Sequence, residues 1–524
     1  MARYVAQRFV PRTPPELSGG GRRRYPVAIV GAGPVGLAAA IDLALHGVPS
    51  VVLDDNDVVS VGSRAICWSK RTLEIFDRLG VGERMLAKGV TWKVGRLFHR
   101  DREVYAFDLQ PEPGHKMPAF INLQQYYVEQ YLVERCADFP GLIELRWKNR
   151  VTGVEPGGDG VRVQVETPDG SYAIEADYLL ACDGVRSTVR RALRLGFIGQ
   201  AFEERFLIAD VEMKAGFPSE RWFWFEPPFH PGQSALLHKQ PDDIYRIDLQ
   251  LGPDADPEAE RRPERVIPRI RAMVGDRPFE LDWVSVYSFQ CRRLERFVHR
   301  RVIFLGDAAH VVSPFGARGG NGGIQDADNL AWKLTLVLQG EAPPTLLDSY
   351  DEERVRAADE NILHSARATR FMTPKSEIER VFRAAVLDLA ADHAFARRLV
   401  NSGRLSLPCA LGGLSLQTPA EAVSGLLAPG AVCPDARLAD ETFLLDRLGG
   451  GFSLLAVGGV AVPDGTGLPV LRVGADRDPH GFAAARYGEA LYLIRPDQHV
   501  AARLTGASSA EVRTALARAR GEGS

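Results

Sequence analysis

The sequence lacks several features that mark specialised classes of protein. No apolar run reaches the roughly 20 residues of a membrane-spanning helix, and the longest candidate, 454–462, is interrupted by glycines. The six cysteines are scattered without a Cys-x-x-Cys pair, so we expect free thiols rather than disulfides or metal ligands. No apolar segment typical of a secretory signal follows Arg3 and Arg8. We therefore expect no membrane partner, no bound metal and a cytoplasmic protein.

A strong net charge is also missing. Lysine and arginine total 64 residues and aspartate and glutamate 67, which leaves a formal net charge of −3. This balance gives no reason to expect a nucleic-acid partner. The composition is that of a globular protein, with 45% hydrophobic and 25% charged residues. A chain of 524 residues is too long for one hydrophobic core, so about two or three domains are expected.

What the chain does contain is organised around residues 27–54. The apolar run 27–30 predicts a buried strand, and the periodic stretch 35–45 predicts a helix that ends at Gly47. A second apolar run, 51–53, ends in Asp54. A strand, a glycine-rich turn, a helix and a second strand with a terminal acid form the dinucleotide-binding fingerprint.

Each residue of this fingerprint has a physical role. Gly31 allows a sharp turn, Gly33 lets the backbone approach a pyrophosphate, and Gly36 lets the helix pack close to the strand. The helix N-terminus offers free N–H groups and a partial positive charge to the same pyrophosphate. Asp54 can accept hydrogen bonds from a ribose. The stretch therefore predicts a bound dinucleotide.

The rest of the chain divides by its patterns. Residues 1–24 are rich in Pro, Gly and Arg and predict a loose, flexible arm. Strands are expected within 90–110, at 151–156 and 161–182, and over most of 200–290. Helices are expected at 69–79, 125–137, 263–274 and 324–338, and from 344 to the mid-360s. A boundary is expected within 373–400, and the tail beyond it predicts the order loop, strand, helix, strand, strand, helix.

Two later motifs fit the same dinucleotide. In the stretch DGVRSTVR a buried strand ends in Asp183, and Ser187 can cap the following helix, although ordinary strand–turn–helix punctuation reads the same way. A second buried strand delivers Gly306 and Asp307 to its carboxyl end, where ligands bind in α/β sheets. Residues 316–323 then hold five glycines in eight residues, which favours a loop whose backbone N–H groups cradle a ligand.

The motifs GAGPVG, DGVRSTVR and GDAAHVVSPFGARGGNGGIQDADNLAWKL together resemble those of the class A FAD-dependent aromatic hydroxylases. The tail stretches 429–438, 443–458 and 491–504 resemble the thioredoxin-like C-terminal domain of the phenol hydroxylase and 3-(3-hydroxyphenyl)propionate hydroxylase branch. The resemblance implies an α/β fold in which an antiparallel substrate-binding sheet (201–290) is inserted into a Rossmann-like FAD-binding domain (25–200 and 291–395), as in para-hydroxybenzoate hydroxylase. A thioredoxin-like domain (396–524) follows. It lacks Cys-x-x-Cys, so docking or dimer support is expected of it rather than redox chemistry.

The resemblance also implies site residues. Gly31, Gly33 and Gly36 would hold the FAD pyrophosphate, and Asp54 the adenosine ribose, at a position where most relatives have Glu. The remaining cofactor contacts would come from Arg64, Gln125, Asp183, Gly306, Asp307, Gly319, Gly320 and Asn321. Relatives commonly read Gly-Gln-Gly-Met-Asn where this chain has Ala317-Arg318-Gly319-Gly320-Asn321. Arg318 therefore either serves an anionic substrate or holds the loop.

The implied activity is a monooxygenase reaction on a phenolic aromatic ring, as part of aromatic catabolism. NADH or NADPH would reduce FAD, and O2 would add to give a flavin C4a-hydroperoxide. Two alternatives share the scaffold: a polyketide-tailoring hydroxylase and a Baeyer–Villiger oxygenase. A plain NAD-dependent dehydrogenase would leave Asp183 and Asp307 unexplained, and a non-catalytic flavin-binding protein would show no substrate-triggered oxidation of NAD(P)H. A homodimer is expected from the resemblance alone.

The substrate is expected against the sheet of 200–290. Alternation places Trp222 and Trp224 on one face and Phe223 and Phe225 on the other, where they form either an aromatic pocket or, more often, a packed core. The polar residues that could meet a hydroxyl or carboxylate are His238, Arg246, Asp248, Tyr287 and Gln290. His238, Tyr287 and Arg318 are the weak catalytic candidates, and His310 is expected to be structural. The sequence assigns no proton acceptor.

Overall fold

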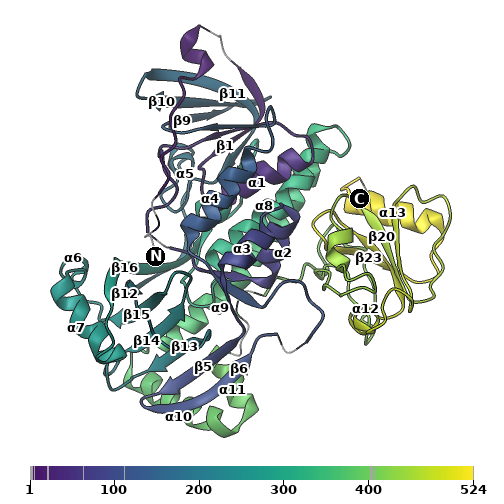
Figure 1. Ribbon diagram of the computed structural model, residues 1–524. Coiled ribbons are helices and arrows are strands. Elements are labelled where there is room, and N and C mark those ends of the chain that lie inside the picture. Colours follow the sequence, from purple (N-terminus) through teal and green to yellow (C-terminus); the bar gives the residue numbers. More distant parts are fainter. Residues whose placement is uncertain are drawn as a thin grey trace.

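The fingerprint strand lies inside a mostly parallel sheet. The computed structural model describes residues 4, 6–19, 23–62, 64–110, 112–401, 405 and 407–522. The strand order is β17-β18-β11-β1-β2-β8, and β10 and β9 continue antiparallel from β11 (Figure 1). The strands are β1 (Arg24–Val30), β2 (Ser50–Leu53), β8 (Ile143–Arg146), β9 (Arg150–Pro156), β10 (Val161–Thr167), β11 (Gly170–Ala181), β17 (Val298–His299) and β18 (Val302–Phe304).

Helices cover this sheet and bury apolar runs such as β1 and β2 on both faces, as parallel strands require. The helix α1 (Pro34–Leu45) packs against both α4 (Gln125–Cys136) and α8 (Gly319–Leu338). The long helix α9 (Asp348–Met372), preceded by the 3-10 turn η3 (Pro344–Leu347), lies along α8. The short helix α5 (Thr188–Ala192) follows β11.

A second, almost wholly antiparallel sheet lies below the first (Figure 1). Its order is β19-β16-β12-β15-β14-β13-β5-β6. The strands are β5 (Val94–His99), β6 (Arg102–Asp108), β12 (Ile198–Glu212), β13 (Arg221–Phe225), β14 (Ser234–Lys239), β15 (Ile244–Leu251), β16 (Glu280–Arg293) and β19 (His310–Val311). The predicted limits 201–290 were therefore too narrow, because β5, β6 and β19 come from outside that range. The strand pairing β5–β13 is parallel and joins segments far apart in sequence.

The two faces of this sheet have different covers. Trp222 and Trp224 belong to the outer face, which packs on the buried apolar side of α7 (Pro263–Val274) beside the short α6 (Pro257–Glu260). Phe223 and Phe225 belong to the inner face, which packs with Phe206, Phe289 and helices α9, α10 (Glu377–Asp392) and α11 (Ala394–Asn401). The predicted alternation is confirmed, and both tryptophans lie in the packed outer core. Helices α10 and α11 occupy the stretch that was expected to hold a boundary.

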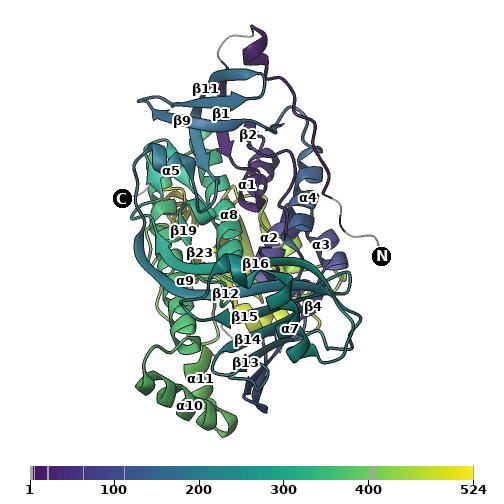
Figure 2. The same ribbon diagram turned by 90° about the vertical axis from the view of Figure 1, so that its left-hand side faces the viewer.

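Between the two sheets lies a small one of order β3-β7-β4, formed by β3 (Cys67–Ser69), β4 (Val90–Trp92) and β7 (Phe120–Asn122). Helices α2 (Lys70–Arg78) and α3 (Gly82–Lys88) adjoin it. Figure 2 shows α2 and α3 between the upper sheet and the large antiparallel sheet. Through β3, this small sheet places residues 67–69 between the mostly parallel sheet and the inner face of the large antiparallel sheet.

The C-terminal part forms a separate sheet of order β21-β20-β22-β23, at the right of Figure 1. Its elements are η4 (Leu444–Arg447), β20 (Ser453–Val457), β21 (Val470–Val473), α12 (Phe482–Tyr487), β22 (Ala490–Ile494), β23 (Val500–Leu504) and α13 (Ser509–Ala519). The predicted order missed β21, which is short and partly exposed and so shows no apolar run. Two apolar clusters lie on the two faces of this sheet.

The described part of residues 1–24 packs against the first sheet and corrects the expectation of a flexible arm. Phe9 stacks on Trp147 at 4.5 Å between ring centroids, and the backbone of Arg8 forms an isolated antiparallel β-bridge with Val58. Glu16, in the 3-10 turn η1 (Pro15–Ser18), is paired at 3.1 Å with Arg146. Residues 1–3, 5 and 20–22 of the arm lie outside the described residues.

All six cysteines are free, as predicted. Among the described helices, none combines the length and the apolar character needed to cross a membrane. The described histidine, cysteine and acidic side chains form no group of three or more that could hold a metal ion.

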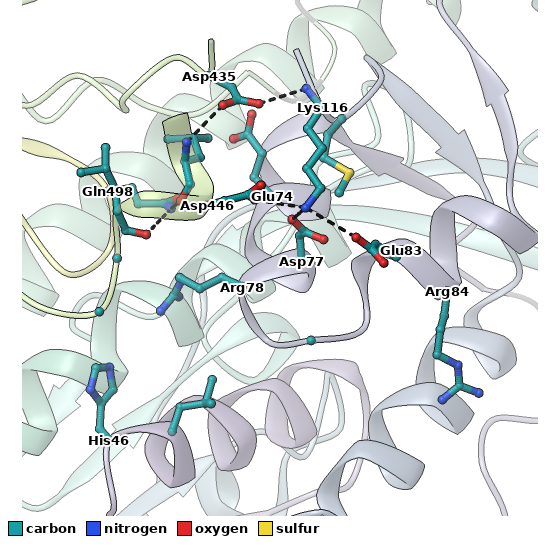
Figure 3. Close-up of a pocket in the computed structure, with 17 residues that line it drawn as sticks. His46, Glu74, Asp77, Arg78, Glu83, Arg84, Lys116, Asp435, Asp446 and Gln498 are labelled. Carbon is teal, nitrogen blue, oxygen red and sulfur yellow. Dashed lines mark hydrogen bonds and ion pairs between the residues drawn. The ribbon is translucent and has the colours of Figure 1, made fainter. Parts of the chain in front are cut away.

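A cavity of about 610 Å³ lies where α2 and α3 face the C-terminal part (Figure 3). The ammonium group of Lys116 reaches Asp77 at 2.7 Å and Asp446 at 3.0 Å, and the Lys116 backbone N–H donates to Asp435 at 2.9 Å. The bonds to Asp435 and Asp446 join Lys116 to the C-terminal part. Lys116 is thus paired across the contact between the two parts.

Glu74 lines the same cavity and gives a prediction for pH dependence. Burial raises the pKa of Glu74 from 4.5 to about 7, against the opposing charges of Arg71 and Lys70. Between these pH values the folded chain keeps a proton that the unfolded chain releases, so stability falls as pH rises from about 5 to 7. The variant Glu74→Gln is expected to be more stable than wild type at pH 8, by up to about 3 kcal/mol, and equal to it near pH 5. Urea unfolding at the two pH values measures this, and an identical difference at both would contradict it.

Candidate cofactor and substrate site

The predicted cofactor residues meet at one edge of the parallel sheet. Gly31 follows β1, Asp54 follows β2, Asp183 follows β11 and Asp307 follows β18. These strands are parallel neighbours in the order β18-β11-β1-β2, so their carboxyl ends lie side by side. In open α/β sheets ligands bind at this edge.

The fingerprint glycines are required by three different geometries. Gly31 has φ of +103°, and a Cβ there would lie 2.5 Å from the carbonyl oxygen of Cys182. A Cβ on Gly36 would overlap the carbonyl oxygen of Gly31, because the first turn of α1 packs against that loop. A Cβ on Gly33 would meet no atom within 4 Å. Gly33 therefore faces open space, where a ligand can approach the protein backbone. The first turn of α1 has no side-chain cap that would compete with a ligand for its free N–H groups.

Asp183 fixes the second motif. Its Oδ2 accepts hydrogen bonds from the backbone N–H groups of Thr188 at 2.6 Å and Val189 at 3.1 Å. Ser187 caps α5 by accepting from Arg190 N–H, as predicted. The Oδ1 of Asp183 is buried and has no hydrogen-bond partner within the described residues. Burial raises the pKa of Asp183, so this oxygen is a ready acceptor for a ligand hydroxyl.

Asp54 and Asp307 lie on either side of this centre. Asp54 Oδ2 accepts from the backbone N–H of Ala32 at 2.6 Å and so ties the glycine turn to the end of β2. Asp307 keeps exposed surface, yet burial raises its pKa against the charges of His310 and Arg64. The protein therefore encloses the Asp307 carboxylate on most sides and leaves it open on one. Asp307 is thus open to a ligand hydroxyl, whereas both oxygens of Asp54 already accept from the chain, Oδ1 from the Asn56 backbone N–H at 2.8 Å.

Helix α8 corrects the predicted glycine loop. It begins at Gly319, so Gly319, Gly320, Gly322 and Gly323 form its first turns rather than a loop before 324. A Cβ on Gly323 would lie 2.6 Å from Val35 Cγ2 and 3.1 Å from Gly306 Cα. Glycine is a poor helix former, but here it allows the first turns of α1 and α8 to converge on Gly306. The N-terminus of α8 has no side-chain cap and no acidic residue, which favours an anionic or electron-rich ligand.

Asn321 ties this helix to the small sheet. Its Oδ1 accepts from the Ser69 backbone N–H, and its Nδ2 donates to the Cys67 carbonyl oxygen, both at 2.9 Å. A Cβ on Gly320 would lie 3.3 Å from the Trp68 ring. Arg318 is 4% exposed and donates to Asn361 of α9 at 3.0 Å. The structure thus gives Arg318 a contact that holds the segment before α8.

Gln125 and Arg64 frame the segment that enters the small sheet. Gln125 Oε1 accepts from the Ala65 backbone N–H at 3.1 Å, and its Nε2 donates to Glu129 at 2.7 Å. The carbonyl oxygen of Arg64 accepts from Arg246 of β15 at 3.0 Å. Residues 64–69 are therefore held on one side by α4 and α8 and on the other by the large sheet.

One buried group was not predicted. Asp326, fully buried in α8, accepts from the Gly306 backbone N–H at 2.9 Å, from His310 at 2.7 Å and from Arg354 at 2.6 Å. Burial alone would raise the pKa of Asp326, but His310 and Arg354 lower it below its usual range. Asp326 holds the turn that carries Asp307 and pairs with His310, whose structural role stays a prediction. The signal available in the sequence was an acidic residue two turns into a helix, in the same motif that carries Asp307.

The polar candidates of the large sheet separate by face. His238 of β14, Arg246 and Asp248 of β15 and Tyr287 of β16 share the inner face through their cross-strand register with Phe223 and Phe206. Gln290 lies between Phe289 and Cys291, which both pack in the inner cluster, so it points to the other face. The structure brings His238 within 3.9 Å of Cys67 Sγ, next to the residues tied to α8.

The residues at this edge fit a bound FAD. The fit rests on the open approach at Gly33, on the unpartnered Asp183 Oδ1 and on two uncapped helix N-termini that converge on Gly306. Residues 24–365 match the family described as FAD binding domain. A flavin-dependent monooxygenase of Mycobacteroides abscessus is 30% identical over 499 residues, covering 90% of this chain and 96% of that protein. The chain belongs to the FAD-dependent monooxygenases.

Two further relatives of this chain are named for different substrates. A 3-(3-hydroxy-phenyl)propionate/3-hydroxycinnamic acid hydroxylase of Mycolicibacterium smegmatis is 29% identical, covering 82% of this chain and 76% of that protein. A 12-dehydrotetracycline 5-monooxygenase/anhydrotetracycline 6-monooxygenase of Streptomyces rimosus is 33% identical, covering 66% of this chain and 69% of that protein.

Solved structures match the fold over nearly the whole chain. The flavin-dependent monooxygenase PieE gives a TM-score of 0.79 at 24% identity, covering 95% of this chain and 99% of that one. The rebeccamycin biosynthetic enzyme RebC gives a TM-score of 0.76 at 26% identity, covering 96% of this chain and 100% of that one. The fold is therefore the mixed α/β fold of FAD-dependent monooxygenases.

Proposed function

We propose that this monooxygenase uses NADH or NADPH and O2 to hydroxylate a phenolic aromatic ring. One observation carries the proposal. Residues 64–69 and the N-terminus of α8 meet the inner face of the large sheet at His238 and Arg246, where polar groups adjoin a cluster of aromatic side chains. A phenol presents the matching combination of an apolar ring and a hydroxyl group.

The chain's own residues would divide the work. Gly31, Gly33, Gly36, Asp54, Asp183 and Asp307 would bind the cofactor, and Arg64, Gln125, Gly306, Gly319, Gly320 and Asn321 would shape the place of its ring system. When bound, FAD supplies the redox chemistry with O2. The aromatic residues of the inner face, such as Phe206 and Phe289, exclude water and orient the substrate ring.

We also propose the domain division expected from the sequence, with β5 and β6 added to the substrate-binding sheet. The C-terminal part would be a thioredoxin-like domain that supports the FAD-binding domain. The bonds of Lys116 with Asp435 and Asp446 favour such a docking role. A homodimer stays a prediction, and sedimentation of the purified protein tests it.

The test is an absorbance spectrum of the purified protein, followed by NADH and NADPH oxidation under air with a panel of phenols. The expected result is a yellow protein whose NAD(P)H oxidation is accelerated by one phenol, with a hydroxylated product identified by mass spectrometry. A colourless protein that cannot be reconstituted with FAD would refute the cofactor assignment. Accelerated oxidation without hydroxylated product would refute the proposed reaction.

A second candidate function is the tailoring of a polycyclic aromatic compound, by hydroxylation or by Baeyer–Villiger oxygenation. The tetracycline monooxygenase relative favours it. Anhydrotetracycline added to the same panel distinguishes the two candidates, because a catabolic phenol hydroxylase should not oxidise it. Turnover of anhydrotetracycline alone would favour the second candidate.

A further inference from the structure

The inner face of the large sheet ends in a row of charged side chains on three neighbouring strands. Arg221 of β13 lies opposite His238 of β14, and His238 lies opposite Arg246 of β15. Asp248 is two residues along from Arg246 and so shares its face. Cys67, which contacts His238, connects this row to Asn321 and the N-terminus of α8. The row therefore lies beside the proposed cofactor site.

The two arginines of the row differ in their partners. Arg246 forms a two-pronged pair with Asp210, with its Nε and Nη2 each 2.8 Å from a carboxylate oxygen. Arg221 is 9% exposed and makes no hydrogen bond or ion pair with any residue that the structure describes. A guanidinium group carries five N–H donors and stays charged in proteins. The Arg221 side chain is mostly buried, but its nitrogen atoms keep some accessible surface, so they are open to an acceptor that the chain itself does not supply.

Asp248 is the complementary case. Neither of its carboxylate oxygens has a hydrogen bond or ion pair within the described chain, and its Oδ1 is buried. The surrounding charges are Arg246 and Arg221, which favour the carboxylate, and Asp210, which disfavours it. Burial outweighs the arginines and raises the pKa of Asp248 to about 6. An unpaired acceptor and an unpaired donor thus share one face without contacting each other.

Other groups around Asp248 do not compete for a proton. Burial and the charges of Arg221 and Arg246 hold the pKa of His238 well below its usual range, which makes it a weak base. Burial raises the pKa of Cys67 to about 11, so its thiol stays neutral. Within the described residues of this row, Asp248 is the group that changes its protonation near neutral pH.

We propose that Arg221 and Asp248 hold the hydroxyl group of the phenolic substrate between them, with Asp248 accepting its proton and Arg221 donating hydrogen bonds to the phenolate oxygen. The inference rests on the proposed function and assigns its missing proton acceptor. The O–H bond breaks, its electron pair stays on the oxygen, and the proton goes to the Asp248 carboxylate, so no oxidant or reductant takes part. The phenolate ring is richer in electrons than the phenol and reacts more readily with an electrophilic oxygen.

The binding test uses 4-nitrophenol, whose phenolate is yellow and whose neutral form is not. Difference spectra of the FAD-loaded enzyme with this probe are recorded over a pH series. Wild type is expected to bind it as the phenolate below the pH at which it ionises in solution. Arg221→Met is expected to bind the neutral form and at least roughly 10-fold more weakly, a loss of about 1.4 kcal/mol. Lys239→Met removes a cation from the adjacent strand outside the row and should match wild type.

The kinetic test compares two phenols of different acidity. With resorcinol, which is neutral in solution at pH 7, Asp248→Asn is expected to lose roughly 100-fold in kcat/KM, the usual range for general-base catalysis. With 4-nitrophenol at pH 8 the loss should be below about 3-fold, because solvent has already removed the proton. The acidic limb of the wild-type pH profile near 6 should vanish in the variant. A positioning role alone would lower both rates equally.

Several outcomes overturn the inference. It fails if Arg221→Met binds the yellow form as wild type does, or if Asp248→Asn loses equally with both phenols or keeps the acidic limb. Asp248→Asn removes an unpaired buried charge, so its FAD content and melting temperature should not fall. Arg221→Lys, which keeps the charge, should partly restore phenolate binding. If the wild type binds 4-nitrophenol as the anion but hydroxylates no phenol, the proposed function fails and the site stands.

Discussion

The Gly36→Ala variant is expected to lose bound FAD and to melt well below the wild-type apoprotein. A Cβ at this position would overlap the carbonyl oxygen of Gly31 and lie 3.3 Å from Cys182 Cβ. Neither neighbour can move cheaply, because Gly31 is itself in a conformation with φ of +103° against the Cys182 carbonyl. Overpacking of this kind costs about 1–3 kcal/mol or more. A displaced loop that also loses about 3 kcal/mol of FAD binding would weaken affinity roughly 100-fold.

Gly33→Ala is the matched control from the same loop. A Cβ on Gly33 meets no protein atom within 4 Å, and Gly33 has φ of −78°, which alanine adopts without strain. The apoprotein should therefore keep its melting temperature, while FAD binding weakens because the added methyl group stands where the cofactor approaches. Thermal melting of both apoproteins and titration with FAD separate the two effects. The fingerprint geometry would be refuted if Gly36→Ala kept both wild-type properties, or if Gly33→Ala destabilised the apoprotein as much.

These glycines also show why part of the site could be predicted from sequence. The contact of Gly36 with Gly31 spans only five positions, and the Ser187 cap on α5 and the helix Pro263–Val274 are equally local. The contact of Gly31 with Cys182 is not local. The alternation that separates Trp222 from Phe223 is equally local, since it follows from the strand geometry alone. Such short-range relations are written in the order of the residues.

The features that were missed depend on contacts between distant segments. Helix α8 starts at Gly319 because Gly323 packs against Val35 and Gly306, and glycine propensity alone would have argued against a helix. Strands β5 and β6 join the large sheet through a pairing of Gly95 with Arg221 that no local pattern encodes. The unpaired state of Arg221 and Asp248 is likewise visible only when all neighbours are placed. The sequence identifies both residues as polar, but it does not show that they lack a hydrogen bond or ion pair within the described chain.

The largest loss of stability is expected from Glu353→Gln. Glu353 of α9 is fully buried, and its carboxylate contacts Lys333 at 2.7 Å and Arg495 at 2.6 and 3.0 Å. Burial would raise the pKa of Glu353, but Arg495 and Lys333 hold it well below its usual range. Its stabilising contribution is therefore fully present above the unfolded pKa and is lost only as pH falls through the much lower folded value.

Removing this charge at neutral pH leaves two buried cations to share the single carboxylate of Asp497. Breaking a buried ion pair by changing one partner typically costs about 3–5 kcal/mol, because the remaining charge stays desolvated. Arg495 comes from the C-terminal part and Lys333 from α8, so the loss falls on the contact between them. Urea unfolding should show the loss in free energy, and limited proteolysis should release the C-terminal part earlier than in wild type.

Glu341→Gln provides the control for this last prediction. Glu341 pairs with Arg520 of the C-terminal part at 3.3 Å, but 55% of its side chain is exposed. Solvent screens an exposed pair of this kind, so its loss should change stability by no more than about 1 kcal/mol. Equal effects of the two variants would mean that burial adds nothing to the Glu353 pair. A large effect of Glu353→Gln without earlier proteolysis would place its role inside the FAD-binding domain rather than at the contact with the C-terminal part.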